Sequence, residues 1–150
     1  MRLRELFADG SINLSLQSTT KDAILAEMIG LLGLDEEAGD AMFRIAKRRE
    51  SLGSTGVGRG VAIPHGRSPV VDKLRLAFGR TREGVEYQGI DGLPVHFLFL
   101  IVAPPLEVSN QYLPVLGKIA QFVKEPDVPG RLMAVGTAEE FLALIDEKGV

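Results

Sequence analysis

The 150-residue sequence contains no cysteine and no tryptophan. The absence of cysteine excludes disulfides, thiolate catalysis and zinc sites built on sulfur. No apolar run approaches the roughly 20 residues that a membrane helix needs. The amino terminus also lacks the apolar core and the small-residue cleavage site of a secretory signal. We therefore expect a cytoplasmic protein that does not insert into a membrane.

A net positive charge is also missing, because 17 lysines and arginines stand against 20 aspartates and glutamates, for a net charge of -3. Nucleic-acid binding generally requires a clustered basic face, so we expect no nucleic-acid partner. Several basic residues nevertheless bracket one glycine-rich segment, and they would give a mildly acidic protein a locally positive surface around that segment. These residues are Arg44, Lys47, Arg48, Arg49, Arg59 and Arg67.

The order of periodic segments is typical of one α/β domain. No internal repeat, low-complexity tract or long linker divides the chain, so residues 1–150 are expected to form a single layered domain. Apolar patterns predict strands over residues 12–16, 61–63, 74–79 and 95–102. Helical spacing predicts a first helix that ends at residue 32, with Ser18, Thr19 and Thr20 as candidate caps. The same signals predict helices over residues 35–50, 110–123 and 137–147. Strands interspersed with helices favour an α/β layered architecture.

The third predicted helix has a start that concerns function. Ser109 or Asn110 is expected to cap it, and its apolar stripe begins at Tyr112 and ends at Val123. Pro114 is compatible with this helix because it lies near the first turn. We therefore expect Tyr112 to face inward, close to the amino terminus of the helix.

Only two histidines are present, and His65 stands in the segment Gly60–Arg67, directly after a short apolar stretch. Pro64 fixes its own φ and restricts the residue before it, so the backbone that reaches His65 is stiff. Gly66 has no Cβ that would crowd an incoming group. Imidazole is partly unprotonated near neutral pH and can attack phosphorus through a ring nitrogen. A lone histidine can also be structural, but the surrounding segment favours a phosphoryl acceptor.

Arg49 is the second candidate. Met42, Ile45, Ala46 and Arg49 fall at helical spacing on one face, so Arg49 extends an apolar stripe inward. The basic residues next to it point elsewhere and are expected to form a solvated face. An inward arginine at a helix end can form a structural salt bridge. It can also contact the equatorial oxygens of a phosphoryl group on His65 in a bidentate manner.

Residues 49–67 read RESLGSTGVGRGVAIPHGR. In type and spacing, this segment resembles the active-site signature of the fructose/mannitol-type (type 2) EIIA family of the bacterial phosphotransferase system. The resemblance extends over nearly the whole chain, including Asp91–Val95, Ala103–Pro105 and Thr137–Phe141. It implies one type-2 EIIA domain over residues 1–150, with a mixed β-sheet flanked by helices on both faces.

The resemblance also implies a function. In this family the histidine of the Pro-His-Gly motif, here His65, receives a phosphoryl group from the phosphohistidine of HPr or an HPr-like carrier. The motif arginine, here Arg49, lies beside it, and no metal or other cofactor is implied. The family suggests Nε2 as the attacking nitrogen, with the other nitrogen held by a local acceptor.

A chain without an attached membrane or EIIB segment is most similar to the nitrogen-regulatory, PtsN-type branch of the family. In that branch the phosphorylation state controls binding to other proteins. The resemblance leaves open whether an EIIB or a regulatory target protein receives or reads the phosphate, and whether any sugar is involved.

The sequence departs from the family at one position, because Tyr112 stands where a second histidine is usual. The Tyr112 hydroxyl can donate a hydrogen bond to phosphate alongside the helix dipole. The ring can instead be an aromatic core residue with its hydroxyl at the rim. The replacement motivates an alternative function, a regulatory protein-binding module that keeps the EIIA fold without transferring phosphate.

Other candidate residues carry weaker signals. The hydroxyls of Ser54 and Thr55 can contact a phosphate from the loop, although turn-forming residues are common there. His96, thirty-one positions from His65, is expected to be a hydrogen-bonded strand residue without a catalytic role. The glycines of residues 53–60 are not followed by a lysine and a serine or threonine, which excludes a P-loop. Two distant histidines leave no evident set of metal ligands.

Overall fold

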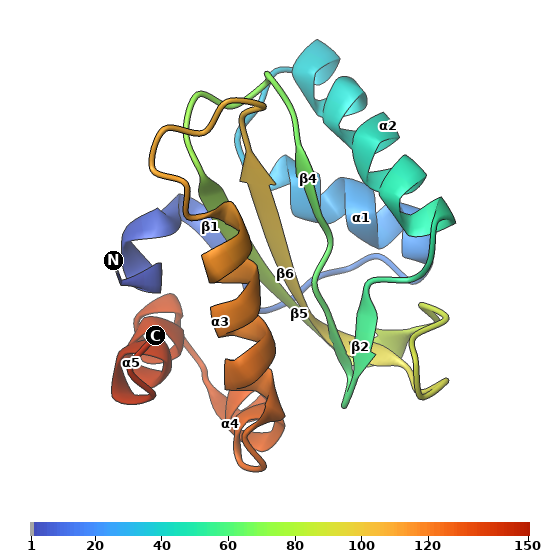
Figure 1. The fold of residues 1–150 in the computed structure, drawn as a ribbon. Coiled ribbons are helices and arrows are strands. Elements are labelled where there is room, and N and C mark those ends of the chain that lie inside the picture. The colour runs from blue at the N-terminus through green and yellow to red at the C-terminus, as the bar shows by residue number, and fades with distance from the viewer. Residues whose placement is uncertain (1) are drawn as a thin grey trace.

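The sheet of this protein is built around one central strand. The computed structural model describes residues 2–150. The strands are β1 (Phe7–Asn13), β2 (Gly56–Gly58), β3 (Val61–Ala62), β4 (His65–Arg67), β5 (Arg75–Val85) and β6 (Val95–Ala103). The six-stranded sheet has the order β1-β5-β6-β3-β2, and β4 also pairs with β6. Because β6 is antiparallel to β5 and parallel to β3 and β4, the sheet is mixed (Figure 1).

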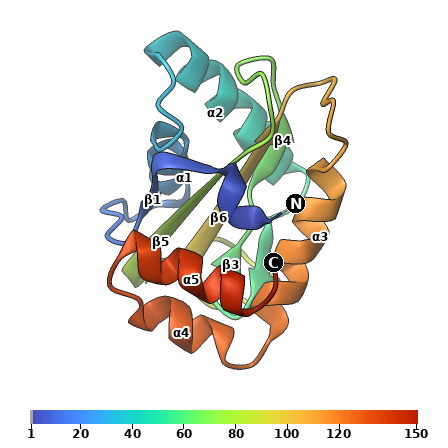
Figure 2. The ribbon, with the colours of Figure 1, turned by 90° about the vertical axis from the view of Figure 1, so that its left-hand side faces the viewer.

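Helices cover both faces of this sheet (Figure 1, Figure 2). One face carries α1 (Lys21–Gly30) and α2 (Glu36–Ser51), and the other carries the 3₁₀ helix η1 (Leu3–Leu6), α3 (Tyr112–Lys124), α4 (Val128–Ala134) and α5 (Ala138–Glu147). Phe97 and Phe99 of β6 pack under α3, whereas Leu98 and Leu100 pack under α1 and α2. The expected α/β fold is confirmed. None of the helices over residues 2–150 is long and apolar enough to cross a bilayer.

Three of the predicted helices begin where their capping residues indicate. The side chains of Thr20, Asp35 and Thr137 each accept a hydrogen bond from a backbone N–H in the first turn, at 3.3, 2.8 and 3.1 Å. Such a side chain satisfies an N–H that has no partner within the helix. The predicted starts of α1, α2 and α5 are therefore confirmed.

The strand bounds differ more from the sequence prediction. The strand predicted over residues 12–16 is wrong in its bounds, because β1 covers residues 7–13. Asp9 and Gly10 interrupt the apolar alternation of this segment. The pairing of β1 with β5 is irregular at these residues, and Gly10 has a φ of 82°. β5 also runs on to Val85 through a polar stretch that the pattern did not mark as strand. The short helix α4 has no counterpart in the prediction.

Strands β3 and β4 are two pieces of one extended segment beside β6. His65 pairs with Ile101 in the parallel register that β3 also keeps with β6. Pro64 lies between the pieces and has no N–H, but its carbonyl accepts the N–H of Ile101 at 3.0 Å. Side chains alternate between the faces of a strand, so His65 and Arg67 share the face of Ile63, which packs toward α3.

Arg80 on β5 is a buried charge, with 3% of its surface exposed. Its Nη1 donates to the carbonyl oxygens of Leu132 and Val135 at the end of α4, at 3.1 and 2.5 Å. Its Nε donates to the carbonyl of Leu14 at 3.1 Å. Burial lowers the pKa of the Arg80 guanidinium, and the nearby charge of Arg82 acts in the same direction. One side chain thus joins β5 to the carboxyl end of α4, where carbonyls lack helical partners.

We expect Arg80→Met to lower the free energy of unfolding by about 2–4 kcal/mol, because an apolar side chain leaves these buried carbonyls unpaired. Denaturant titration followed by circular dichroism measures the change. Arg82→Met is the matched control, because Arg82 is exposed and its loss should cost less than about 0.5 kcal/mol. Equal stability of the two variants would contradict this role of Arg80.

Candidate functional site

The imidazole of His65 is held by the backbone just before it. Its Nδ1 lies 2.8 Å from the carbonyl oxygen of Ile63. Because a carbonyl oxygen can only accept, Nδ1 carries a proton and donates it, so in the neutral imidazole the lone pair is on Nε2. The side chain is half-buried at the start of β4. Nε2 is therefore the ring nitrogen that is left for chemistry.

Tyr112 lies next to His65 on the face of α3, and Arg67 lies over the Tyr112 ring. The centroids of the Tyr112 ring and the imidazole are 6.2 Å apart, with 57° between the ring planes. The guanidinium carbon of Arg67 lies 4.4 Å from the centroid of the Tyr112 ring, a cation–π contact. Burial raises the pKa of Tyr112, although the charges of Arg67 and Arg49 oppose the shift. The Tyr112 hydroxyl is therefore a proton donor at neutral pH.

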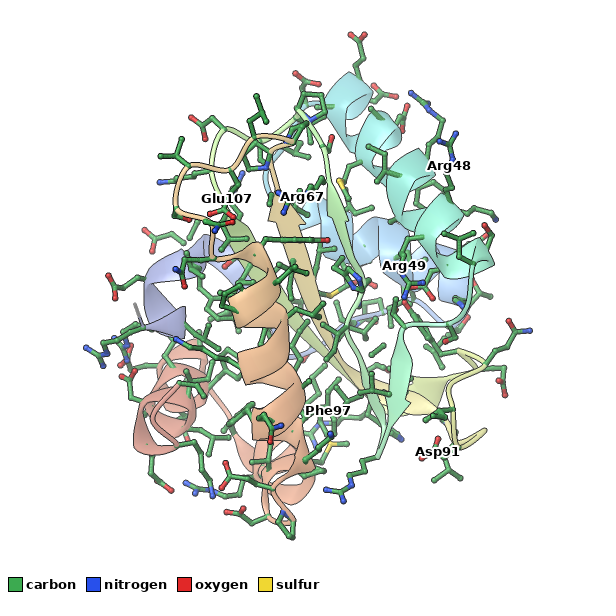
Figure 3. The ribbon with its side chains drawn as sticks, viewed as in Figure 1. Arg48, Arg49, Arg67, Asp91, Phe97 and Glu107 are labelled. Carbon is green, nitrogen blue, oxygen red and sulfur yellow. The ribbon has the colours of Figure 1, made fainter. Side chains whose placement is uncertain are left out.

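Arg49 approaches the same place from the other face of the sheet. β4 pairs with β6 alone among the strands of residues 2–150, so the end of α2 can reach around its free edge. Arg49 is half-buried in the last turn of α2, and its Nη1 donates to the carbonyl of Gly53 at 2.7 Å. Figure 3 shows Arg49 beside β4, with Arg67 on that strand nearer to α3. The structure thus gathers His65, Arg49, Arg67 and Tyr112.

The other basic residues around the glycine-rich segment have different surroundings. Lys47 forms an ion pair with an aspartate of α1, and Arg59 donates to a carbonyl at the end of α3. Arg44 and Arg48 are exposed on α2. Of the six basic residues around this segment, Arg49 and Arg67 are the two whose charges act on Tyr112, the neighbour of His65.

Glu107 closes the amino terminus of α3 (Figure 3). Its carboxylate accepts the N–H groups of Gln111 and Tyr112, each at 3.0 Å. The prediction that Ser109 or Asn110 caps this helix is wrong. The Ser109 hydroxyl itself donates to Glu107, and Asn110 has a φ of 56° without a capping hydrogen bond. A phosphoryl group near His65 would therefore meet arginine side chains rather than these two helix amides.

The hydroxyls of Ser54 and Thr55 face other partners. The Ser54 hydroxyl donates to the carbonyl of Tyr87 at 2.8 Å. The Thr55 hydroxyl donates to the carboxylate of Glu50, and Thr55 is only 4% exposed. The structure therefore does not direct either hydroxyl proton toward His65.

His96 lies away from the site. Its Nδ1 is 3.0 Å from the carbonyl oxygen of Thr81. It stands five residues along β6 from Ile101, the partner of His65, and five strand residues span about 16 Å. Within residues 2–150 no group of three or more histidine, aspartate or glutamate side chains is arranged to hold a metal ion.

Sequence reasoning names Arg67 only as one of six basic residues around the glycine-rich segment, and it does not name Glu107 at all. Arg67 has a usable signal, because a residue two positions after His65 on a strand lies on the same face. Glu107 has no such signal in the sequence, because its contact depends on how the loop between β6 and α3 folds back onto the helix. The first residue could have been predicted and the second could not.

Known proteins are similar to this chain over nearly its whole length. The family model described as "Phosphoenolpyruvate-dependent sugar phosphotransferase system, EIIA 2" matches residues 5–148. The nitrogen regulatory protein of Bradyrhizobium diazoefficiens is 32% identical over 149 residues, which cover 97% of this chain and 95% of that protein. The fructose-specific EIIABC component of Bacillus subtilis is 30% identical over 98% of this chain, which spans 23% of that longer protein.

Solved structures show the same fold. The crystal structure of nitrogen regulatory protein IIA-Ntr from Neisseria meningitidis is 35% identical, with a TM-score of 0.85 and coverage of 94% of this chain and 97% of that one. The crystal structure of IIA mannitol from Escherichia coli has a TM-score of 0.74 at 21% identity, over 92% of this chain and 97% of that one. At 21% identity, the comparison with IIA mannitol shows that the two chains share a fold.

We expect Glu107→Ala to speed hydrogen exchange at the amides of Gln111 and Tyr112, because α3 loses its cap. The free energy of unfolding should fall by about 1 kcal/mol. Exchange followed residue by residue by NMR measures the first effect. Ser109→Ala is the control and should leave both amides protected. The reverse pattern would identify Ser109 as the cap.

Proposed function

We propose a phosphocarrier function for this chain, which belongs to the EIIA 2 family of the phosphoenolpyruvate-dependent sugar phosphotransferase system. The acceptor is Nε2 of His65, and the donor is a phosphohistidine of HPr or an HPr-like carrier. The observation that carries the proposal is the hydrogen bond from Nδ1 of His65 to Ile63. It leaves the lone pair of Nε2 as a nucleophile at a site with two guanidinium groups.

Transfer on this proposal is an in-line displacement between two imidazoles. The bond from phosphorus to the donor nitrogen breaks, and the lone pair of Nε2 forms the new bond to phosphorus. Nδ1 of His65 keeps its proton, and the Ile63 carbonyl stabilises the positive charge that develops on the ring. Arg49 and Arg67 balance the charge of the equatorial oxygens. Positioning and electrostatics therefore supply the catalysis.

Tyr112 has its own part in this proposal. Its hydroxyl is protonated and its ring lies against Arg67, so it can donate a hydrogen bond to an oxygen of the phosphoryl group. Its backbone amide cannot do so while Glu107 accepts it. The hydroxyl would thus stabilise phospho-His65 in place of the imidazole that is usual in the family.

Exposed apolar side chains near the start of α3 suit a transient protein partner. Leu106, Val108 and Leu113 have relative exposures of 90, 100 and 67%, and an apolar patch with polar surroundings is typical of a protein-binding surface. We propose that an HPr-type donor docks over this surface in the cytoplasm. The relatives named nitrogen regulatory protein favour a target protein that reads the phosphorylation state of His65.

An EIIB protein is the other possible recipient on this proposal. A solved complex joins enzyme IIAMtl of Escherichia coli to phosphorylated enzyme IIBMtl. A second candidate function, a protein-binding module without phosphoryl transfer, is favoured by one feature, the tyrosine at position 112. The first experiment below separates transfer from binding alone.

We expect one acid-labile phosphoryl group on the chain after incubation with phosphoenolpyruvate, enzyme I and an HPr-type carrier. Intact-mass spectrometry measures it. His65→Ala should abolish the adduct, because it removes the nucleophile, whereas His96→Ala should leave it in place. If the wild-type chain takes up no phosphoryl group, the carrier function is wrong and the binding module remains.

We expect Tyr112→Phe to shorten the half-life of phospho-His65 by about tenfold, because a hydrogen bond to a charged group is lost. Acid-quenched time courses of the isolated phosphoprotein measure the half-life. Tyr112→His restores a donor and should keep the half-life closer to that of the wild type. An unchanged half-life in Tyr112→Phe would show that the hydroxyl does not contact the phosphate.

A further inference from the structure

We infer that Glu50 is a positioning residue, which acts through Thr55 and Ile63 to hold the His65 imidazole in the tautomer and orientation that present Nε2. The consequence for phosphoryl transfer rests on the proposed function. The consequence for the imidazole itself does not, because it follows from hydrogen bonds within the chain.

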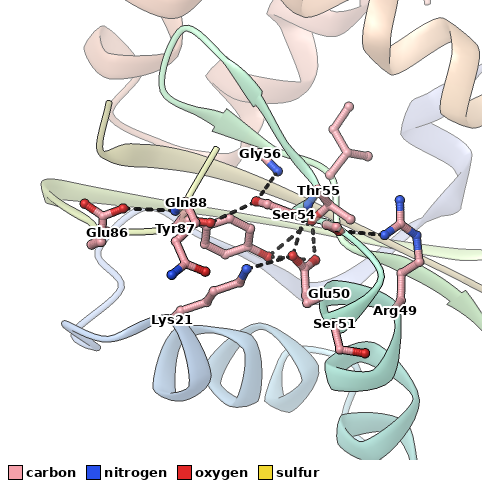
Figure 4. Close-up of polar contacts among 12 residues, drawn as sticks. Lys21, Arg49, Glu50, Ser51, Ser54, Thr55, Gly56, Glu86, Tyr87 and Gln88 are labelled. Carbon is pink, nitrogen blue, oxygen red and sulfur yellow. Dashed lines mark hydrogen bonds and ion pairs between the residues drawn. The ribbon is translucent and has the colours of Figure 1, made fainter. Parts of the chain in front are cut away.

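The carboxylate of Glu50 is the centre of a buried polar cluster (Figure 4). Glu50 lies at the end of α2 and is 8% exposed. Its Oε1 lies 3.1 Å from Nζ of Lys21 and accepts the backbone N–H of Thr55 at 3.0 Å. Its Oε2 accepts the hydroxyl of Thr55 and that of Tyr87, the latter at 3.2 Å. A buried carboxylate with this many donors has one well-defined position.

Tyr87 and Lys21 add contacts on two sides of the Glu50 carboxylate. Tyr87 has no exposed surface, and burial together with the Glu50 charge raises the pKa of its phenol, so the hydroxyl remains a donor. Nζ of Lys21 also lies 4.5 Å from the centroid of the Tyr87 ring. The ammonium balances the carboxylate on one side and contacts the ring on the other. Glu50 therefore ties Thr55 to α1, to α2 and to the segment that directly follows β5.

A short run of backbone contacts leads from Thr55 to the imidazole. The carbonyl of Thr55 accepts the N–H of Ile63 at 3.0 Å, and the carbonyl of Ile63 accepts Nδ1–H of His65 at 2.8 Å. Thr55 and Ile63 are 4% and 2% exposed, so water does not readily replace either contact. If Thr55 moved, Ile63 would lose the partner of its N–H, and its carbonyl would no longer be held under Nδ1.

The tautomer of His65 depends on this carbonyl. The ring nitrogen that carries the proton is set by the acceptor that it meets. Without a fixed acceptor at Nδ1, the proton can occupy Nε2, and that tautomer has no lone pair on the attacking nitrogen. Glu50 itself touches neither His65 nor a transferring group in the contacts that the structure shows, so it positions the acceptor without being a catalytic residue.

The test is Glu50→Gln. The amide keeps one oxygen acceptor but turns the other into a donor, so the contacts to Thr55, Lys21 and Tyr87 cannot all persist. Two-bond ¹H–¹⁵N correlation spectra of the His65 imidazole report its tautomer without any phosphate. We expect Nδ1–H to dominate in the wild type and the Nε2–H form to rise in Glu50→Gln. Transfer from a phosphorylated HPr-type carrier should slow by about tenfold, as for other residues that orient a functional ligand.

Two controls separate positioning from general stability. Tyr87→Phe removes one donor to Glu50 but leaves both Thr55 contacts, so it should lower the melting temperature and leave the tautomer unchanged. Glu86→Gln alters an exposed carboxylate that accepts only the nearby N–H of Gln88 and should change neither property. If Glu50→Gln does not fold, Glu50→Asp retains the charge but withdraws it from Thr55, and the same shift in tautomer is expected.

A folded Glu50 variant with the tautomer and transfer rate of the wild type would overturn the inference. An equal shift of the His65 tautomer in Tyr87→Phe would also overturn it, because the shifts in both variants would then reflect a loss of stability alone. If the wild-type chain accepts no phosphoryl group, the proposed function fails, and the tautomer comparison still decides the role of Glu50.

Discussion

A single hydrogen bond, from Nδ1 of His65 to the carbonyl oxygen of Ile63, decides which nitrogen of the imidazole carries a proton. The position of Ile63 depends in turn on two long-range partners. Pairing of the segment with β6 sets its register, and the carbonyl of Thr55 holds its N–H. The buried carboxylate of Glu50 holds Thr55. Nε2 of His65, the acceptor on the proposed function, is thus oriented by the core of the protein rather than by the surface around it.

The free edge of β4 explains how the site is assembled. His65 and Arg67 alternate onto the α3 face, where Tyr112 contacts both. α2 lies on the opposite face, and it can contribute Arg49 because no further strand of residues 2–150 covers this edge. Had β4 been an internal strand, the two faces would have been separated by the sheet. The short edge strand is therefore what lets both helices contribute to one site.

The electrostatics of the site come from side chains more than from the helix. Glu107 occupies the amides of Gln111 and Tyr112 at the start of α3, so these amides are not open to an anion. On the proposed function, the charge that balances a phosphoryl group is on Arg49 and Arg67, which both act on the Tyr112 hydroxyl. A chain with tyrosine in place of the usual histidine would thus rely on two guanidinium groups and a phenol.

The sequence by itself determined the three helices that begin at Thr20, Asp35 and Thr137, the central strand β6 and the stiff segment before His65. Those features depend on contacts within a few residues: the Asp35 cap closes its own helix, and an apolar run marks β6 as buried whatever surrounds it. Only the tertiary structure decided the rest. Arg80 lies in the part of β5 that the pattern did not mark and reaches carbonyls at the end of α4. Glu107 caps α3 from a loop that folds back. Glu50 acts on His65 through residues that come together only when the sheet forms. Their partners are distant in sequence or set by loop geometry, so no local pattern records them.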